Sequence, residues 1–143
     1  MIKPTSSPFP DPKERTPAIL VVEDEILIRF VISDYLQHCG FRVYEAGNAA
    51  EAIAILESDK AAIDLVFSDL QMPGEMDGFG LSQWIKQNRP GLPILLTSGD
   101  KKKSATAKEL CENEPFFAKP YDVAQIVAQI RTLIDTKART KET

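Results

Sequence analysis

The sequence has few of the residues from which disulfide frameworks and metal centres are usually built. It contains two cysteines and one histidine among 143 residues. Cys39 and Cys111 fit neither a disulfide framework nor a metal-ligand spacing, so we expect both to be reduced, mostly buried thiols. His38 falls near the polar end of an expected helix, where a surface role is favoured over catalysis or metal binding.

Long apolar runs and an excess of basic charge are missing as well. No apolar stretch approaches the length of a membrane span, and the first residues lack the basic start and apolar core of a secretory signal. The net charge of -4 gives no general attraction to nucleic acid or anionic lipid. The one dense basic run, Lys101 to Lys103, is more typical of a solvated loop than of a docking patch. We therefore expect a cytoplasmic protein that binds neither nucleic acid nor membrane.

The length allows one domain with a full core and is too short for two of ordinary size. Residues 1–17 contain five of the ten prolines and offer no packing face, which predicts an extended or disordered tail. A short binding epitope there is the less favoured alternative. We expect the folded domain to span residues 18–136 and a short polar tail to occupy residues 137–143.

Short apolar runs alternate with segments of helical periodicity along the domain. The predicted strands are Ile19 to Val22, Phe41 to Ala46, a run ending at Asp69, Ile94 to Thr97 and Phe116 to Ala118. The predicted helices are Ile26 to Cys39, one capped by Asn48 and reaching Leu56, one carrying Leu81 to Ile85, a weakly apolar one between Lys101 and Asn113, and one from Asp122 to Ile134. This order predicts an α/β fold of the flavodoxin-like class, a doubly wound five-stranded parallel sheet, (βα)5, with helices on both faces.

Charged and hydroxyl side chains stand at the ends of four of these strands. Glu23 and Asp24 follow the first, Asp69 ends the third, Thr97 ends the fourth and Lys119 follows the fifth. Because the carboxyl ends of parallel strands form one edge of the sheet, these residues should converge there.

The three carboxylates would repel one another if left alone. A hard divalent cation resolves this repulsion, and Mg²⁺ suits an all-oxygen cluster. Mg²⁺ on one side and the Lys119 ammonium on the other could neutralise a phosphoryl group in transfer. Glu23 and Asp24 are adjacent and can share the metal, whereas Asp69 stands alone, so Asp69 is predicted to be the nucleophile.

The chain closely resembles the response-regulator receiver domain of two-component signalling from about Ala18 to Ile134. The matching segments are Val21-Val22-Glu23-Asp24-Glu25, Asp69-Leu70-Gln71-Met72-Pro73-Gly74 with Asp77-Gly78, Thr97-Ser98-Gly99 and Lys119-Pro120. The resemblance implies phosphorylation at Asp69 and Mg²⁺ bound by Glu23, Asp24, Asp69 and the backbone carbonyl of Gln71. It also implies that Thr97 and Lys119 contact the phosphoryl group.

Some positions refine this resemblance. Phe116 takes the place of the aromatic switch residue without a phenolic hydroxyl, so switching would work by ring burial and exposure. Ser98 is small, as access to the phosphoryl group requires. Lys119-Pro120 resembles the cis peptide that aims the family's lysine. The polar segment after the fourth strand casts doubt on a firm dimer surface there, so we expect a monomer or weak dimer.

The resemblance implies a phospho-accepting signalling domain rather than an enzyme. Its expected partners are a histidine kinase or histidine phosphotransfer protein and an unknown downstream protein that reads the phosphorylated state. A phosphate sink or relay without its own output is the main alternative. A phosphorylation-independent adaptor is less favoured, and so is an aspartate-nucleophile phosphatase, because that family's second aspartate is replaced here by Gln71. A Walker-type glycine-lysine loop is absent.

Overall fold

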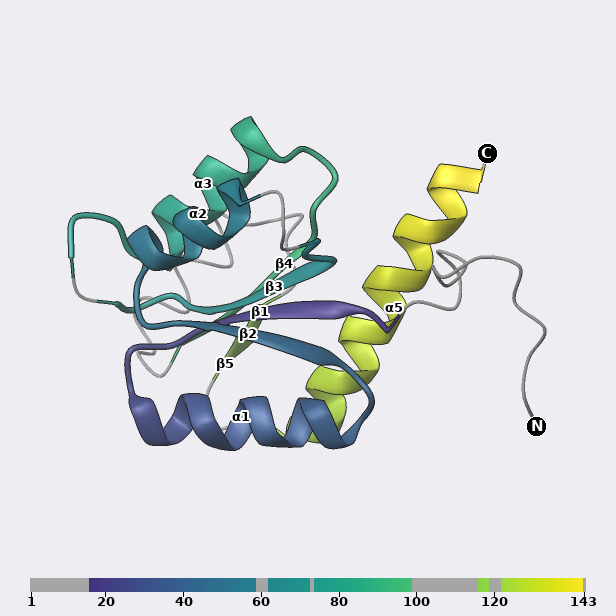
Figure 1. Cartoon of the computed structure of the whole chain (residues 1–143), viewed down its shortest axis with the longest axis horizontal. Coiled ribbons are helices and arrows are strands. Elements are labelled where there is room, and N and C mark those ends of the chain that lie inside the picture. Colours follow the sequence, from purple (N-terminus) through teal and green to yellow (C-terminus); the bar gives the residue numbers. More distant parts are fainter. Residues whose placement is uncertain (1–15, 59–61, 73, 99–115, 119–121, 143) are drawn as a thin grey trace.

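The computed structural model describes residues 16–58, 62–72, 74–98, 116–118 and 122–142, with side chains except at 98, 116–118 and 136–142 (Figure 1). Five parallel strands form one sheet in the order β2-β1-β3-β4-β5. Their bounds are β1 Ala18–Val22, β2 Arg42–Ala46, β3 Leu65–Asp69, β4 Ile94–Ser98 and β5 Phe116–Ala118. This order is that of the flavodoxin-like doubly wound fold, which confirms the predicted fold class.

Four described helices cover the two faces of the sheet. They are α1 Ile26–His38, α2 Ala49–Glu57, α3 Gly78–Asn88 and α5 Val123–Glu142. Helices α2 and α3 pack on one face, and α1 and α5 pack on the other (Figure 1). The predicted helix between Lys101 and Asn113, with Lys101 to Lys103 and Cys111, lies outside the described residues, as do residues 1–15 of the predicted tail.

The core lies on both sides of the central strand β1, whose five residues are all buried. Leu20 and Val22 face α2 and α3, whereas Ile19 and Val21 face α1 and α5. Burial on both faces explains why this strand is a continuous apolar run instead of an alternating one.

The apolar residues of α1 recur at helical spacing, but the sheet covers only some of them. Val31 and Tyr35 are exposed, while Ile32 and Leu36 are buried. The apolar residues of α1 extend around more than half of the helix, and the sheet can cover only one side of it. Cys39, at the end of α1, is half-buried and free, and His38 is exposed.

Helix α5 continues to Glu142, beyond the last apolar position at Ile134. Residues 137–142 are therefore helical, where we expected a polar tail. The segment contains neither proline nor glycine, so no residue in it stops the helix. None of the described helices is both long enough and apolar enough to cross a bilayer.

The start of α3 packs directly against the end of β3. The amide of Gly78 donates to the carbonyl of Leu70 at 2.9 Å. A Cβ atom at Gly78 would lie 2.2 Å from the carbonyl oxygen of Asp69 and 2.7 Å from the Cα of Leu70. Only glycine allows this approach, which closes the loop that follows Asp69.

Replacement of Gly78 by alanine should therefore destabilise the fold. The added methyl meets backbone that cannot move away without displacing β3, so we expect Gly78→Ala to lower the free energy of unfolding by about 1–3 kcal/mol. Urea denaturation followed by circular dichroism measures this. Gly80→Ala is the matched control, since the same change two residues later meets side-chain atoms of Met76 and Asp77 and no backbone. Equal effects of the two substitutions would contradict the close-approach explanation.

Candidate functional site

Three carboxylates converge at the carboxyl edge of the sheet. Glu23 and Asp24 follow β1 and Asp69 ends β3, and one carboxylate oxygen from each lies within 4.8 Å of the others. Glu23 and Asp69 are buried, with exposed fractions of 1% and 5%, whereas Asp24 is exposed. The structure thus brings together the three acidic side chains that the sequence placed at one edge.

The strand register produces this convergence. Val22 of β1 is paired with Ser68 of β3, so the next residue on each strand, Glu23 and Asp69, reaches the same level of the sheet. Asp69 is in turn paired with Thr97 of β4. Beyond the strands, the amide of Leu70 donates to the carbonyl of Thr97 at 2.7 Å, which extends the pairing of β3 and β4 into the loop.

Backbone amides hold two of the carboxylates. The amide of Gln71 donates to Oδ1 of Asp69 at 3.2 Å, and the amide of Glu25 donates to Oε1 of Glu23 at 3.3 Å. Both bonds span two residues and fold the chain back on its own carboxylate. The two buried acids are therefore oriented by the backbone that follows each of them.

The guanidinium of Arg29, on α1, binds the segment that follows β1. Nη1 of Arg29 donates to the backbone carbonyl of Glu23 at 2.9 Å, and its Nε donates to a carboxylate oxygen of Glu45 at 3.3 Å. A Cβ atom at Gly47 would lie 3.1 Å from Nη1, so glycine leaves room for the guanidinium. Arg29 could not be predicted as a site residue, because its place among apolar helix residues does not reveal which loop it reaches.

The donor set fits a hard divalent cation. Two unit negative charges 4 to 5 Å apart repel by about 1 kcal/mol in water and by about 4 kcal/mol at the effective dielectric of a protein surface. Three such carboxylates are therefore costly alone, and carboxylate oxygen is the ligand type that Mg²⁺ prefers. Glu23, Asp24 and Asp69 could hold the ion.

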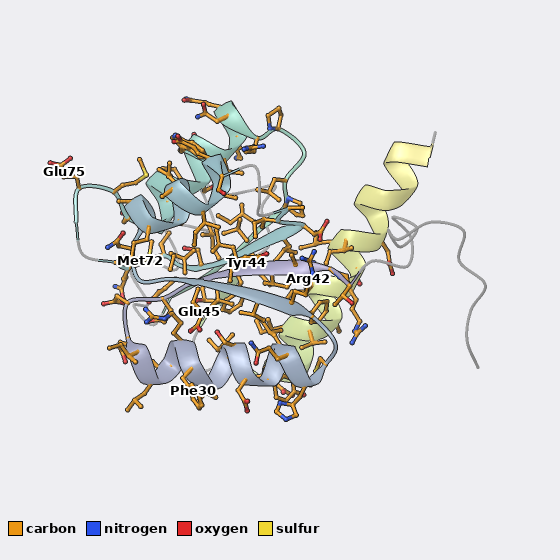
Figure 2. The ribbon with its side chains drawn as sticks, in the orientation of Figure 1. Phe30, Arg42, Tyr44, Glu45, Met72 and Glu75 are labelled. Atoms are coloured by element: carbon orange, nitrogen blue, oxygen red, sulfur yellow. The ribbon has the colours of Figure 1, made fainter. Side chains whose placement is uncertain are left out.

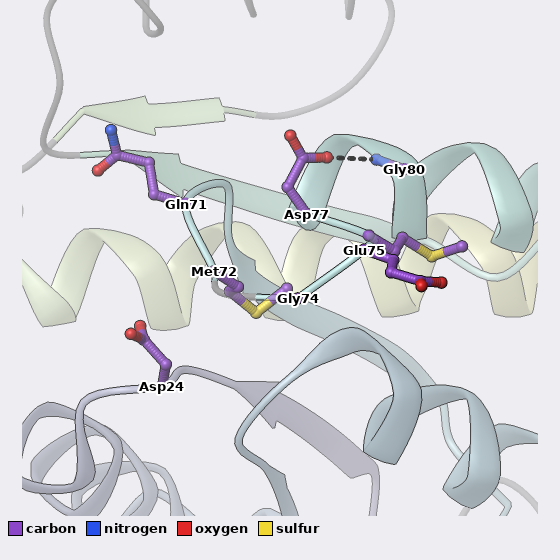
Figure 3. Close-up of a pocket in the computed structure, with 8 residues that line it drawn as sticks. Asp24, Gln71, Met72, Gly74, Glu75, Asp77 and Gly80 are labelled. Carbon is purple, nitrogen blue, oxygen red and sulfur yellow. Dashed lines mark hydrogen bonds between the residues drawn. The ribbon is translucent and has the colours of Figure 1, made fainter.

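A cavity of about 790 Å³ opens beside the carboxylates (Figure 3). Asp24 lies on one side of it and the loop between β3 and α3 lies on the other. The residues that line it are Asp24, Gln71, Met72, Gly74, Glu75, Met76, Asp77 and Gly80. Asp77 caps α3 there, since its Oδ1 accepts from the amide of Gly80 at 2.8 Å. Of the three clustered carboxylates, Asp24 is the one that lines this cavity.

Thr97 carries a buried hydroxyl beside Asp69. The residue is fully buried, and its hydroxyl oxygen has no hydrogen-bond partner in the described part of the chain. Because Thr97 and Asp69 are register partners, their side chains point to the same face of the sheet. An unpaired buried hydroxyl costs free energy, which a new acceptor at Asp69 could recover.

The remaining predicted site residues are described in part. Gln71 follows β3 and lines the cavity. The backbone of Ser98 ends β4 and that of Phe116 begins β5. Lys119 and Pro120, and with them the predicted cis peptide, lie outside the described residues.

The model of the response regulator receiver domain family matches residues 19–131 of the chain. The chain belongs to this family. The prediction of a receiver domain is thereby confirmed, and receiver domains are signalling domains of two-component systems that accept a phosphoryl group. The family assignment and the flavodoxin-like sheet agree on one architecture for the region from β1 to α5.

Solved receiver domains have the same fold. The signal receiver domain of an HD domain-containing protein from Pseudomonas fluorescens is 28% identical, with a TM-score of 0.77 over 87% of this chain and 99% of that one. A response regulator receiver protein from Sinorhizobium medicae is 26% identical, with a TM-score of 0.75 over 85% of this chain and 97% of that one.

Curated relatives of the receiver domain are longer proteins. The uncharacterized transcriptional regulatory protein YbdJ of Bacillus subtilis is 28% identical over 117 residues, which are 82% of this chain and 50% of that protein. The sensor kinase CckA of Brucella abortus is 31% identical over 119 residues, which are 82% of this chain and 12% of that protein. The receiver domain thus spans half or less of the length of these relatives.

Neutralising one carboxylate of the receiver domain should stabilise the metal-free protein. In the Asp69→Asn variant the amide oxygen could still accept from the backbone amide of Gln71, while the repulsion from Glu23 and Asp24 would be lost. We expect this substitution to raise the free energy of unfolding by about 1–3 kcal/mol in the presence of a chelator. Urea denaturation measures the change. Glu57→Gln, on the exposed end of α2, is the control with the same change in net charge. A decrease in stability for Asp69→Asn would contradict the described electrostatics.

Proposed function

We propose that Asp69 accepts the phosphoryl group from a histidine kinase or a histidine phosphotransfer protein, in a Mg²⁺-dependent reaction. The observation that carries the assignment is the position of Asp69. It is buried at the end of β3, it lies within 4.8 Å of the other two carboxylates, and it is the register partner of Thr97. Glu23 and Asp24 follow β1, which is not a neighbour of β4 in the sheet.

The reaction forms an acyl phosphate. A carboxylate oxygen of Asp69 attacks phosphorus while the bond from phosphorus to the donor imidazole nitrogen breaks. The electron pair of that bond stays on the nitrogen, and the donor histidine, which carries a proton on its other ring nitrogen, leaves as a neutral imidazole. Glu23, Asp24, Asp69 and the carbonyl of Gln71 would hold Mg²⁺, which supplies charge neutralisation for the phosphoryl oxygens.

The roles of the other residues follow from the family resemblance and their positions. Thr97 would donate its hydroxyl to a phosphoryl oxygen, and Lys119 would pair with the same group. Ser98 would leave the phosphoryl group accessible. Phe116, at the start of β5, would switch by burial and exposure of its ring. Pro120 would fix the peptide that aims Lys119. The phosphorylated domain would then bind a downstream protein, or would serve as a phosphate sink or relay.

Incubation with acetyl phosphate and Mg²⁺ should add one phosphoryl group to the wild-type chain and none to Asp69→Asn. Intact-mass spectrometry measures the addition. A chelator should slow it at least about tenfold, because the carboxylates would then repel the anionic donor. Glu75→Gln is the matched control, since Glu75 is exposed and lines the same cavity away from the carboxylates. An equal gain of mass in Asp69→Asn would contradict the assignment.

Thr97→Val should change the stability of the unphosphorylated domain and that of the phosphorylated domain in different ways. Valine keeps the shape and removes the unpaired buried hydroxyl, so the unphosphorylated protein should become more stable by about 1 kcal/mol. The stabilisation that beryllofluoride gives the wild type should shrink in the variant, because a donor to the phosphoryl analogue is lost. Thermal denaturation with and without beryllofluoride measures both effects. Equal stabilisation of the two proteins by beryllofluoride would refute the role of Thr97.

A further inference from the structure

One arginine binds the backbone on both sides of Asp24. The amide of Arg29 donates to the carbonyl of Glu25 at 2.9 Å, and its Nη1 donates to the carbonyl of Glu23 at 2.9 Å. Residues 23–25 are the whole connection between β1 and α1. Asp24 therefore lies at the centre of a short segment whose two flanking carbonyls accept from the same residue.

The side-chain bond fixes a peptide group that two of the clustered carboxylate residues share. The carbonyl of Glu23 and the amide of Asp24 belong to one planar unit, which also contains the α-carbons of both residues. The orientation of that carbonyl therefore sets the direction in which Asp24 leaves the segment relative to Glu23. The amide of Glu23 donates to the carbonyl of Ala46 at 3.0 Å, so both backbone groups of Glu23 are bound.

Arg29 is itself held by β2. Its Nε donates to Oε1 of Glu45 at 3.3 Å. Glu45 lies on the side of β2 that faces α1 (Figure 2). Val43, two residues earlier on the same side of the strand, packs in the core that α1 covers. The guanidinium is thus fixed between the end of β2 and the carbonyl of Glu23.

The position of this ion pair suits local orientation more than overall stability. The side chains of Arg29 and Glu45 are 22% and 47% exposed, and ion pairs with such exposure change the free energy of unfolding little. The bond from Nη1 reaches a carbonyl only six residues earlier in the chain. Its effect therefore falls on the conformation of residues 23–25.

We propose that Arg29 is a positioning residue for Mg²⁺. By holding residues 23–25 in the metal-binding conformation before the ion arrives, it raises the affinity of the site. Groups that orient metal ligands typically change metal affinity by about 10- to 100-fold. Binding to a segment that is already ordered loses no free energy to ordering it. This inference rests on the proposed function, which includes Mg²⁺ at Glu23, Asp24 and Asp69.

The charge of Arg29 acts in the opposite direction. A cation near the carboxylates repels Mg²⁺, so through charge alone the loss of Arg29 would tighten Mg²⁺ binding. The carboxylate of Glu45 offsets much of this charge, and salt screens what remains. We therefore expect the positioning effect to exceed the charge effect. The two effects predict opposite orders of affinity among variants.

Titration of the unphosphorylated chain with Mg²⁺ in about 0.15 M salt, followed by amide NMR chemical shifts, measures the affinity without a phosphoryl donor. Arg29→Met keeps an unbranched side chain and removes the charge and the donors, so the dissociation constant should rise at least about tenfold. Arg29→Lys keeps the charge but replaces the guanidinium fork by one ammonium. Its affinity should lie between those of wild type and Arg29→Met.

Arg131→Met is the matched control. Nη2 of Arg131, on α5, donates to the carbonyl of Cys39 at 2.8 Å, at the other end of α1. The substitution removes the same charge and the same kind of bond from the end of α1 that lies away from the carboxylates. It should leave the Mg²⁺ dissociation constant unchanged.

Four outcomes would overturn the inference. Arg29→Met could bind Mg²⁺ as tightly as wild type or more tightly, Arg29→Lys could bind it as tightly as wild type, or Arg29→Lys could bind it more weakly than Arg29→Met. Arg131→Met could also lose as much affinity as Arg29→Met. The dispersion of the amide spectrum establishes that each variant is folded. If Arg29→Met does not fold, the comparison of Arg29→Lys with wild type decides the matter.

The same titration distinguishes this inference from the proposed function. A wild type that binds Mg²⁺ but is not phosphorylated at Asp69 would contradict the proposed function and leave the role of Arg29 supported. A wild type that is phosphorylated, together with an Arg29→Met variant of unchanged Mg²⁺ affinity, would contradict the role of Arg29 alone. A wild type that does not respond to Mg²⁺ would contradict both.

Discussion

The repulsion among three carboxylates held at one edge of the sheet is the constraint on which the site depends. Glu23, Asp24 and Asp69 cannot move apart, because the paired strands β1 and β3 fix where each chain leaves the sheet. The backbone amides of Glu25 and Gln71 and the guanidinium of Arg29 offset part of this cost from the protein's own groups. A divalent cation bound by these carboxylates would neutralise negative charge and could then bind an incoming phosphoryl group.

The surroundings of Asp69 connect this charge to the rest of the fold. Gly78 brings the start of α3 against the carbonyl of Asp69, and Thr97 carries a buried hydroxyl on the neighbouring strand that is unpaired among the described residues. The start of α3 and the end of β4 are therefore the parts of the fold that lie directly beside Asp69. On the other side, α1 begins at Ile26, two residues after Asp24, so its first turn lies close to the same site.

The sequence predicted the strands and their convergent ends well, because a buried parallel strand is an unbroken apolar run and its carboxyl end has a fixed place in the sheet. The exposure of Val31 and Tyr35 on α1 could not be predicted in the same way, since periodicity identifies apolar residues without showing which of them the sheet covers. Arg29 was missed because its contacts with Glu23 and Glu45 join segments that are distant in sequence. The extension of α5 to Glu142 depends on the absence of a stop signal, which apolar spacing does not record.

The most direct test of this account is to locate the phosphorylated residue chemically. Borohydride reduces an acyl phosphate and converts the modified aspartate into homoserine, which peptide sequencing by mass spectrometry can place. After incubation with acetyl phosphate and Mg²⁺, the account predicts homoserine at position 69 and none when a chelator is present. Homoserine at position 24, or modification that is independent of Mg²⁺, would contradict it.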